Sequence, residues 1–195
     1  IWQIELGGAM AEQPTLYAAN GILYVGAYDG KVHAIDAASG ELAPGFEFEV
    51  LDPETGEPQD TAGNWFWSKV LAAGDQIYAT SLDGWLYALD PATGEMIPGD
   101  SYQSPEFEGQ DDALRASPVE AGEFIIVASE SGKVTAVQNG QRQWDWPSGA
   151  PDAAILTAPV VGGDTVYVVQ MNGHVQALEA QTGREVWDFA PPEGD

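Results

Sequence analysis

The segment Ile77-Tyr78-Ala79-Thr80-Ser81-Leu82-Asp83-Gly84-Trp85-Leu86-Tyr87-Ala88-Leu89-Asp90 decides the fold of this chain. It consists of an apolar run, a tight Asp-Gly turn and a second apolar run. Such a turn between two apolar runs is the strongest short-range signal for a two-residue β-hairpin. Similar segments occur at residues 22–36, 125–137 and 166–179. The chain therefore contains four predicted hairpins of one kind.

The four hairpins belong to a longer repeat. Their turn glycines recur every 40 to 55 residues or so, close to the roughly 40–50 residues of a propeller blade. An apolar strand segment precedes each hairpin, and another follows a later glycine. Four strands per unit is typical of a β-propeller. We therefore expect an all-β fold, a single propeller domain with four-stranded antiparallel blades at residues 13–49, 66–104, 115–147 and 156–190.

Residues 1–7 read as the outer strand of a preceding blade, with no first three strands before them. The sequence thus predicts four complete blades plus an N-terminal outer strand. Three arrangements fit this count: a segment of a larger ring, a ring that closes through another chain, or a four-bladed ring. We favour the first. Open blade edges would promote self-association in such a segment.

The composition excludes several functions. The chain of 195 residues carries 31 acidic and 6 basic residues, a formal net charge of −25. Such a surface repels phosphate backbones, so we expect no nucleic-acid partner. No apolar run approaches the roughly 20 residues needed to cross a bilayer, so we expect no direct membrane insertion. Cys is absent, which excludes disulfides, thiol nucleophiles and cysteine-ligated metals.

The repeat resembles that of the PQQ-like β-propeller family. The segment Tyr87–Gly94, with its Tyr-Ala-Leu-Asp-x-x-Thr-Gly pattern, and Trp187 after Thr182-Gly183-Arg184-Glu185 carry this resemblance. The family includes quinoprotein alcohol and glucose dehydrogenases. It also includes a non-enzymatic lipoprotein of outer-membrane assembly and many envelope or extracellular repeat proteins. The resemblance implies a periplasmic, cell-surface or extracellular location.

The same resemblance implies which residues dock one blade on the next. In the family, a glycine and a tryptophan of each repeat make this contact. The matching positions here are Gly40, Gly94, Gly140, Gly183, Trp144 and Trp187. Phe46 and Tyr102 stand where the repeat usually has Trp, so we expect weaker docking there.

The family's catalytic apparatus has no match here. Quinoprotein dehydrogenases of this family are longer, eight-bladed rings, and many hold the quinone near a vicinal disulfide with Ca²⁺ on Glu, Asn and Asp. We expect no PQQ and no catalytic residue in this chain. His33 and His174 occupy different strand registers, so a shared metal site is not expected. Acidic residues that could gather Ca²⁺ follow no loop code, and we interpret them as solvated loops. They are Asp52, Glu54, Glu57, Asp60, Asp111 and Asp112.

The candidate binding surface comprises Trp65, Trp67 and Arg115. Trp65 and Trp67 share parity in an extended segment, so both side chains should point the same way. Arg115 stands at the matching entrance of the third blade. Trp and Arg are typical interface anchors, which favours a peptide or glycan surface. The alternative is that these rings pack as core.

The sequence thus predicts a non-catalytic binding or scaffolding module of the cell envelope or extracellular space. Its expected partner is a protein or peptide, with a glycan as a second option. Two alternatives remain: a fragment of a PQQ-dependent quinoprotein dehydrogenase, and the ligand-sensing ectodomain of a membrane receptor.

Overall fold

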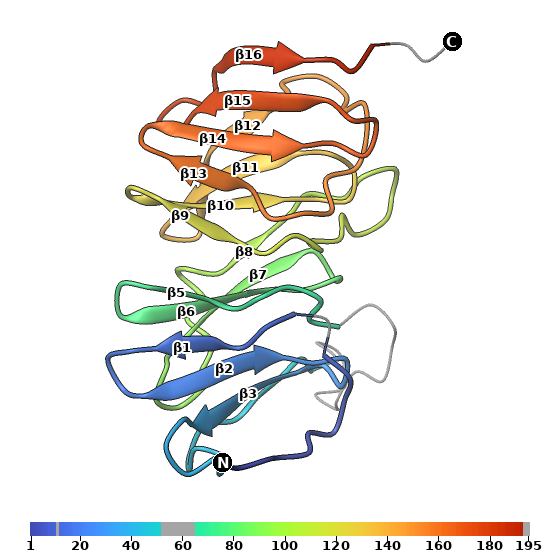
Figure 1. Cartoon of the computed structure of the whole chain (residues 1–195). Coiled ribbons are helices and arrows are strands. Elements are labelled where there is room, and N and C mark those ends of the chain that lie inside the picture. Colours follow the sequence, from blue (N-terminus) through green and yellow to red (C-terminus); the bar gives the residue numbers. More distant parts are fainter. Residues whose placement is uncertain (11, 52–64, 193–195) are drawn as a thin grey trace.

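The structure is a computed structural model that describes residues 1–10, 12–51 and 65–192 (Figure 1). In these residues, strands form four antiparallel four-stranded sheets, or blades, each in chain order. Blades 1 to 4 follow one another from the N-terminal to the C-terminal end of the molecule (Figure 1). The predicted all-β propeller architecture is confirmed. The strands are β1 (Thr15–Tyr17), β2 (Ile22–Gly26), β3 (Lys31–Asp36) and β4 (Phe48–Glu49) in blade 1; β5 (Leu71–Ala73), β6 (Gln76–Thr80), β7 (Trp85–Leu89) and β8 (Tyr102–Gln103) in blade 2; β9 (Val119–Ala121), β10 (Phe124–Ala128), β11 (Val134–Gln138) and β12 (Gln141–Trp146) in blade 3; and β13 (Val160–Gly162), β14 (Thr165–Val169), β15 (Val175–Glu179) and β16 (Glu185–Phe189) in blade 4.

The β6–β7 hairpin shows why the repeated segment folds as it does. Ile77 pairs with Leu89 across the hairpin, and both side chains are fully buried. Gly84 takes a φ of 82° at the turn, a region that favours glycine. The Asp83 carboxylate accepts a hydrogen bond from the Trp85 backbone N–H at 3.0 Å. The Asp-Gly pair therefore supplies both the backbone freedom and the polar partner of the turn.

The hydrophobic core is divided among the three blade interfaces. Tyr24 and Ile77 belong to the cluster between blades 1 and 2, and Leu86 and Ile125 to the cluster between blades 2 and 3. Between blades 3 and 4, the cluster includes Leu178. An alanine sits in the third strand of every blade and is almost completely buried, which lets neighbouring sheets approach closely. These alanines are Ala34, Ala88, Ala136 and Ala177.

The innermost strands are β1, β5, β9 and β13, and adjacent ones contact each other. The apolar segments at residues 68–71, 117–119 and 158–161 predict innermost strands, and β5, β9 and β13 begin two or three residues later than these segments do. The residues just before them make hydrogen bonds between blades: the Lys69 backbone N–H donates to the Ser117 hydroxyl at 2.9 Å, and the Thr80 hydroxyl donates to the Ala116 carbonyl at 3.0 Å. These contacts use backbone groups that strand pairing would otherwise need.

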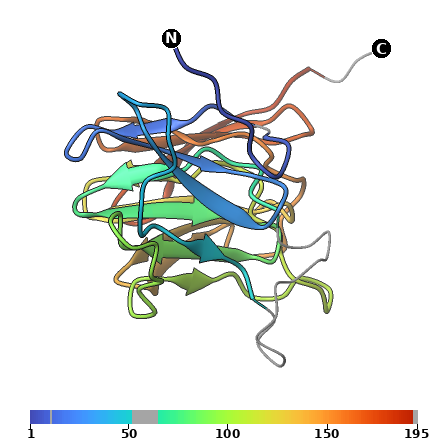
Figure 2. The ribbon, with the colours of Figure 1, turned by 90° about the horizontal axis from the view of Figure 1, so that it is seen from below.

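The N-terminal segment differs from its prediction. Residues 1–10 form no strand, and Figure 2 shows them as an irregular dark-blue trace beside blade 1. A strand needs a paired neighbour, and none of the ladders among the described residues includes residues 1–10. The segment is held instead by Trp2, whose Nε1 donates to the Ala37 carbonyl at 3.1 Å, and by the Tyr28 N–H, which donates to the Ala9 carbonyl at 2.9 Å.

Candidate functional site

The structure brings the three predicted binding residues together around Tyr28. The Tyr28 ring stacks with Trp65 and with Trp67, at centroid distances of 5.3 and 5.4 Å and interplanar angles of 16° and 19°. The Arg115 guanidinium lies 4.6 Å from the centre of the Trp67 ring. It also forms an ion pair with Glu130, with 2.9 Å between Nε and Oε2. We call Trp65, Tyr28, Trp67 and Arg115 the aromatic stack.

Three blades contribute to the aromatic stack. Phe66, between the two tryptophans, is fully buried against Gly26 of blade 1, where an added Cβ would lie 2.4 Å from the Phe66 Cβ. Alternation along an extended segment then places Trp65 and Trp67 on the opposite side from Phe66. Tyr28 follows β2, and sequence reasoning missed it because nothing in its hairpin turn indicates where blade 2 will lie. The available signal was its position directly before the Asp29-Gly30 turn, where an aromatic side chain lies at the end of the hairpin.

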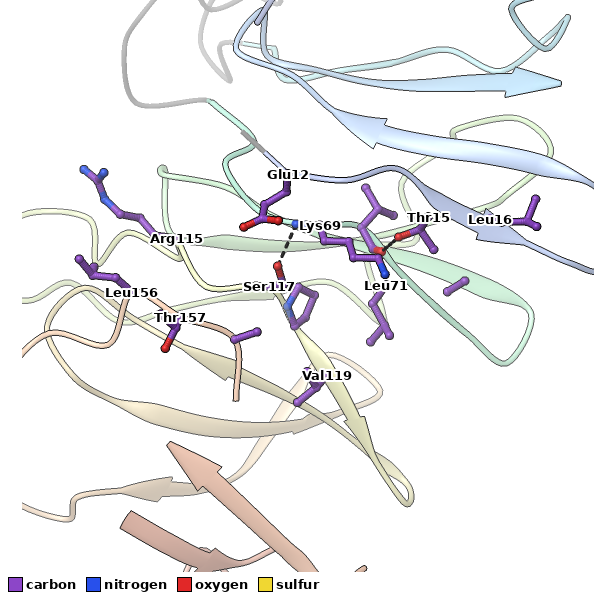
Figure 3. Close-up of a pocket in the computed structure, with 14 residues that line it drawn as sticks. Glu12, Thr15, Leu16, Lys69, Leu71, Arg115, Ser117, Val119, Leu156 and Thr157 are labelled. Carbon is purple, nitrogen blue, oxygen red and sulfur yellow. Dashed lines mark hydrogen bonds between the residues drawn. The ribbon is translucent and has the colours of Figure 1, made fainter. Parts of the chain in front are cut away.

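A groove of about 510 Å³ lies beside the aromatic stack. Its walls come from residues in, or just before, the innermost strands of all four blades (Figure 3). The lining residues are Glu12, Thr15, Leu16, Lys69, Val70, Leu71, Ala72, Arg115, Ser117, Pro118, Val119, Leu156, Thr157 and Ala158. Arg115 belongs to both features. Its guanidinium points away from the centre of the groove in Figure 3, as its contacts with Trp67 and Glu130 require.

Hydroxyl groups fix the backbone of the groove walls. The Thr15 hydroxyl donates to the Val70 carbonyl, which joins β1 to the entrance of β5. Leu16 and Leu156 leave apolar surface at the groove, with exposures of 54% and 37%. The walls are therefore firmly held strand ends with apolar side chains between them. This is the usual composition of a binding cleft, which combines apolar lining with a few placed polar groups.

Lys69 is distinctive among the basic residues. All six lie in the described part of the chain, and five of their side chains have an acidic or carbonyl partner there. Those five are Lys31 with Glu49, Arg115 with Glu130, Arg142 with Asp145, Arg184 with Glu179, and Lys133 with the carbonyls of Pro147 and Gly149. The Lys69 ammonium has no such partner among the described residues. The groove thus presents a cation in a strongly acidic molecule.

The predicted docking residues meet their neighbours in two different ways. Trp144 lies on Gly183, and its Nε1 donates to the Ala180 carbonyl at 3.0 Å. Trp2 lies on Gly40 in the same manner. Trp187 is 45% exposed, and no described glycine has it as a near neighbour.

The other two glycines have no tryptophan over them. An added Cβ on Gly94 would meet the Glu47 backbone at 2.6 Å, and one on Gly140 would meet the Gly99 carbonyl at 2.5 Å. Backbone thus covers glycine at the interfaces where Phe46 and Tyr102 replace Trp. The side chains of both aromatics join the blade-interface clusters instead.

The remaining candidate groups serve local structure. His33 pairs with Asp29 at 2.9 Å and His174 with Asp188 at 3.1 Å, in different blades. Asp112 accepts hydrogen bonds from the Ser131 backbone N–H and hydroxyl at 2.9 and 2.7 Å. In the described part of the chain, no three His, Cys, Asp or Glu side chains gather as a metal site would require. Asp52, Glu54, Glu57 and Asp60 lie outside the described residues. No helix among the described residues is long and apolar enough to cross a membrane.

Comparison with curated proteins gives two kinds of relative. The chain is 28% identical over 180 residues to the outer membrane protein assembly factor BamB of Shewanella oneidensis, which covers 87% of this chain and 41% of that protein. It is 29% identical over 159 residues to the quinohemoprotein alcohol dehydrogenase of Comamonas testosteroni, which covers 74% of this chain and 21% of the enzyme. The chain therefore spans less than half the length of either relative.

Solved structures of both kinds share the fold. The crystal structure of the Comamonas testosteroni enzyme matches with a TM-score of 0.69 at 20% identity, covering 94% of this chain and 35% of the enzyme. BamB from Moraxella catarrhalis matches with a TM-score of 0.61 at 17% identity, covering 96% of this chain and 66% of that structure. The family model described as outer membrane protein assembly factor BamB matches residues 1–187. Because this match covers nearly the whole chain, and the blades and their docking glycines agree with it, the chain belongs to this family of PQQ-like propellers.

Proposed function

We propose that this chain is a non-catalytic scaffold of the cell envelope that binds a polypeptide in the groove. The observation that carries the proposal is the groove itself, which all four blades line through the ends of their innermost strands. Each of these strands is an edge strand that pairs with one neighbour in its blade, and each contributes residues to the groove lining from within the strand or just before it. An extended peptide can add to such edges and place alternate side chains against apolar surface.

The aromatic stack supports the groove rather than offering open rings. Tyr28 and Arg115 both lie against Trp67, so its ring surface is used within the molecule. The stack connects blades 1, 2 and 3 beside Arg115, and we call the part of the groove at Arg115 its mouth. We propose that Trp65, Trp67 and Arg115 act on binding by fixing the shape of this mouth.

Family membership supports the location and the kind of partner. The matching family is described as an outer membrane protein assembly factor, as is the Shewanella relative. A protein partner in the envelope, in the periplasm or at the cell surface, is therefore proposed for this chain. A glycan partner has less support, because the ring faces of Trp67 on which a sugar would stack are taken by Tyr28 and Arg115.

Fluorescence anisotropy with a fluorescein-labelled peptide of alternating Val and Thr residues tests the groove. We expect the peptide to bind, and Leu156→Asp to weaken binding about tenfold, the equivalent of one lost apolar side-chain contact. Leu42→Asp is the control, because Leu42 is also an exposed leucine, at 56% against 37% for Leu156, and lies outside the groove. Equal affinities for both variants would place the peptide elsewhere. A peptide with Pro in place of Thr should bind more weakly if strand edges contribute.

The second candidate is a segment of a quinone-dependent dehydrogenase. The similarity to quinohemoprotein alcohol dehydrogenases favours it. We propose that this chain does not hold the quinone, since no residue in it matches the family's Ca²⁺ and quinone ligands. Titration of the protein with PQQ and Ca²⁺, followed by absorbance and by thermal unfolding, should give no saturable change. Saturable binding that raises the melting temperature would support the dehydrogenase instead.

A further inference from the structure

Lys69 is the basic side chain of the groove that no described group neutralises. Two basic residues line the groove, Lys69 and Arg115, and Arg115 is already paired with Glu130 and stacked on Trp67. Lys69 is exposed, and its one hydrogen bond as a donor among the described residues comes from its backbone N–H. The ammonium group is therefore available to a ligand in the groove.

The backbone holds Lys69 inside the groove rather than at its mouth. The Lys69 N–H donates to the Ser117 hydroxyl at 2.9 Å, and Ser117 lies two residues beyond Arg115 along the groove wall. Figure 3 shows the Lys69 side chain extending toward Thr15 and Leu71, away from Arg115. A peptide that enters the groove past Arg115 therefore meets the ammonium group with one of its internal residues.

The surroundings of Lys69 contain little negative charge. The chain carries 31 acidic residues, but Glu12 is the one acid among the described residues that line the groove. The six ion pairs of the described residues do not include one between Glu12 and Lys69. The Ser117 hydroxyl lines the same wall, and while its oxygen accepts from Lys69 it keeps an O–H to donate. This part of the groove offers donors and needs an acceptor.

We propose that the polypeptide bound in the groove presents an Asp or Glu side chain to Lys69, and that Lys69 makes the groove selective for such segments. This inference rests on the proposed function, since it names the kind of peptide that the groove takes. The carboxylate would accept a charge-assisted hydrogen bond from the ammonium group. Alternate residues of an extended peptide lie on one side, so its apolar side chains would contact Leu71 and Val119.

The net charge of the chain opposes this selection at long range. A protein of net charge −25 repels an acidic peptide, but salt screens charges that are more than about 8 Å apart at physiological ionic strength. The contact with Lys69 is made at hydrogen-bond distance, where screening is weaker. The preference for a carboxylate is therefore expected at physiological ionic strength and should weaken at low ionic strength, where the repulsion reaches further.

Fluorescence anisotropy with three peptides tests the proposal. Each is an alternating Val and Thr peptide with blocked termini and the same label, and carries Asp, Asn or Lys at its centre. At physiological ionic strength we expect the Asp peptide to bind about fivefold more tightly than the Asn peptide, the upper end for an exposed ion pair. Lys69→Gln should lose this preference, and Lys69→Glu should prefer the Lys peptide. Lys31→Gln is the matched control, because it removes the same charge from outside the groove and should keep the preference.

The outcomes separate this inference from the proposed function. Equal binding of the Asp and Asn peptides by the parent chain would overturn the selection by charge and leave the groove as a peptide site. A preference that persists in Lys69→Gln would assign it to another cation. If an Asn peptide with a free C-terminal carboxylate binds as tightly as the Asp peptide, the groove takes a chain end and not a side chain. If none of the peptides binds, the proposed function fails and this inference fails with it. Melting curves of each variant show that its fold is retained.

Discussion

Replacing Gly183 with Ala tests whether blade docking depends on a seat without a side chain. Gly183 has a φ of 66°, and an added Cβ would lie 2.3 Å from Cε3 of Trp144. The left-handed conformation costs an Ala residue about 1–2 kcal/mol. Pushing the indole from its seat adds about 1–3 kcal/mol, as overpacking does elsewhere. Loss of the Trp144–Ala180 hydrogen bond removes about 1 kcal/mol more. We expect the free energy of unfolding to fall by about 3–6 kcal/mol in total.

Gly163 provides the matched control. Its φ is 61°, close to that of Gly183, but no atom lies within 4 Å of an added Cβ. Gly163→Ala should therefore lose only the conformational part, about 1–2 kcal/mol. The difference between the two variants isolates the docking contact from the backbone effect.

Urea unfolding, followed by far-UV circular dichroism and by tryptophan fluorescence, measures both losses. In a Trp144→Ala background, Gly183→Ala should lose no more than Gly163→Ala does, because the ring that it displaces is gone. Equal losses for Gly183→Ala and Gly163→Ala in the parent chain would refute the docking argument. They would mean that the indole moves aside without loss of stability.

Three further changes test the buried hydroxyl and the two turn carboxylates. Thr80→Val leaves the Ala116 carbonyl without its donor at the interface of blades 2 and 3, and should lower the free energy of unfolding in urea by about 1–3 kcal/mol; an unchanged midpoint would contradict this. Burial raises the pKa of the Asp83 carboxyl, so the ionised form opposes folding increasingly as pH rises through the raised folded-state value. Asp83→Asn should therefore gain stability relative to the parent chain between pH 4 and pH 7 in urea unfolding, and a constant difference would argue against it. Backbone N–H groups, that of Ala92 foremost, lower the pKa of Asp90 below its usual 3.8, so the stability it contributes is present above that value and lost as pH falls through the lowered one. Asp90→Ala should lose more stability at pH 6 than at pH 2, as measured by thermal unfolding at each pH.

The sequence predicted those parts of the fold that depend on local chemistry. Asp83-Gly84 specifies a turn within its own few residues, so the hairpin follows from its composition. The fourfold recurrence then implies blades, because such a sheet buries its faces only against copies of itself. Strand ends and the N-terminal segment were predicted less well. Whether residues 1–7 form a strand depends on a neighbour, and no local pattern reports one.

In the candidate site, too, the sequence predicted what depends on local alternation and missed what depends on how the blades pack. The alternation of Trp65, Phe66 and Trp67 indicated that the two indoles share one side, and the structure places them so. Tyr28 could not be found this way, since its stacking depends on how blade 1 lies against blade 2. The groove is likewise a product of assembly, because each blade contributes only a few of its lining residues.

The four docking glycines show what the repeat requires at each interface. Their covers differ: an indole at Gly40 and Gly183, and backbone at Gly94 and Gly140. What they share is a positive φ and a close approach that excludes any side chain. The requirement for glycine therefore does not depend on tryptophan, which explains how Phe46 and Tyr102 are tolerated. The backbone covers, Glu47 and Gly99, lie just before β4 and β8, whereas Trp2 lies in a segment that forms no strand and is held by its Nε1 hydrogen bond to the Ala37 carbonyl. The cover at Gly40 is therefore the one, among the four docking glycines, that comes from a segment without strand pairing.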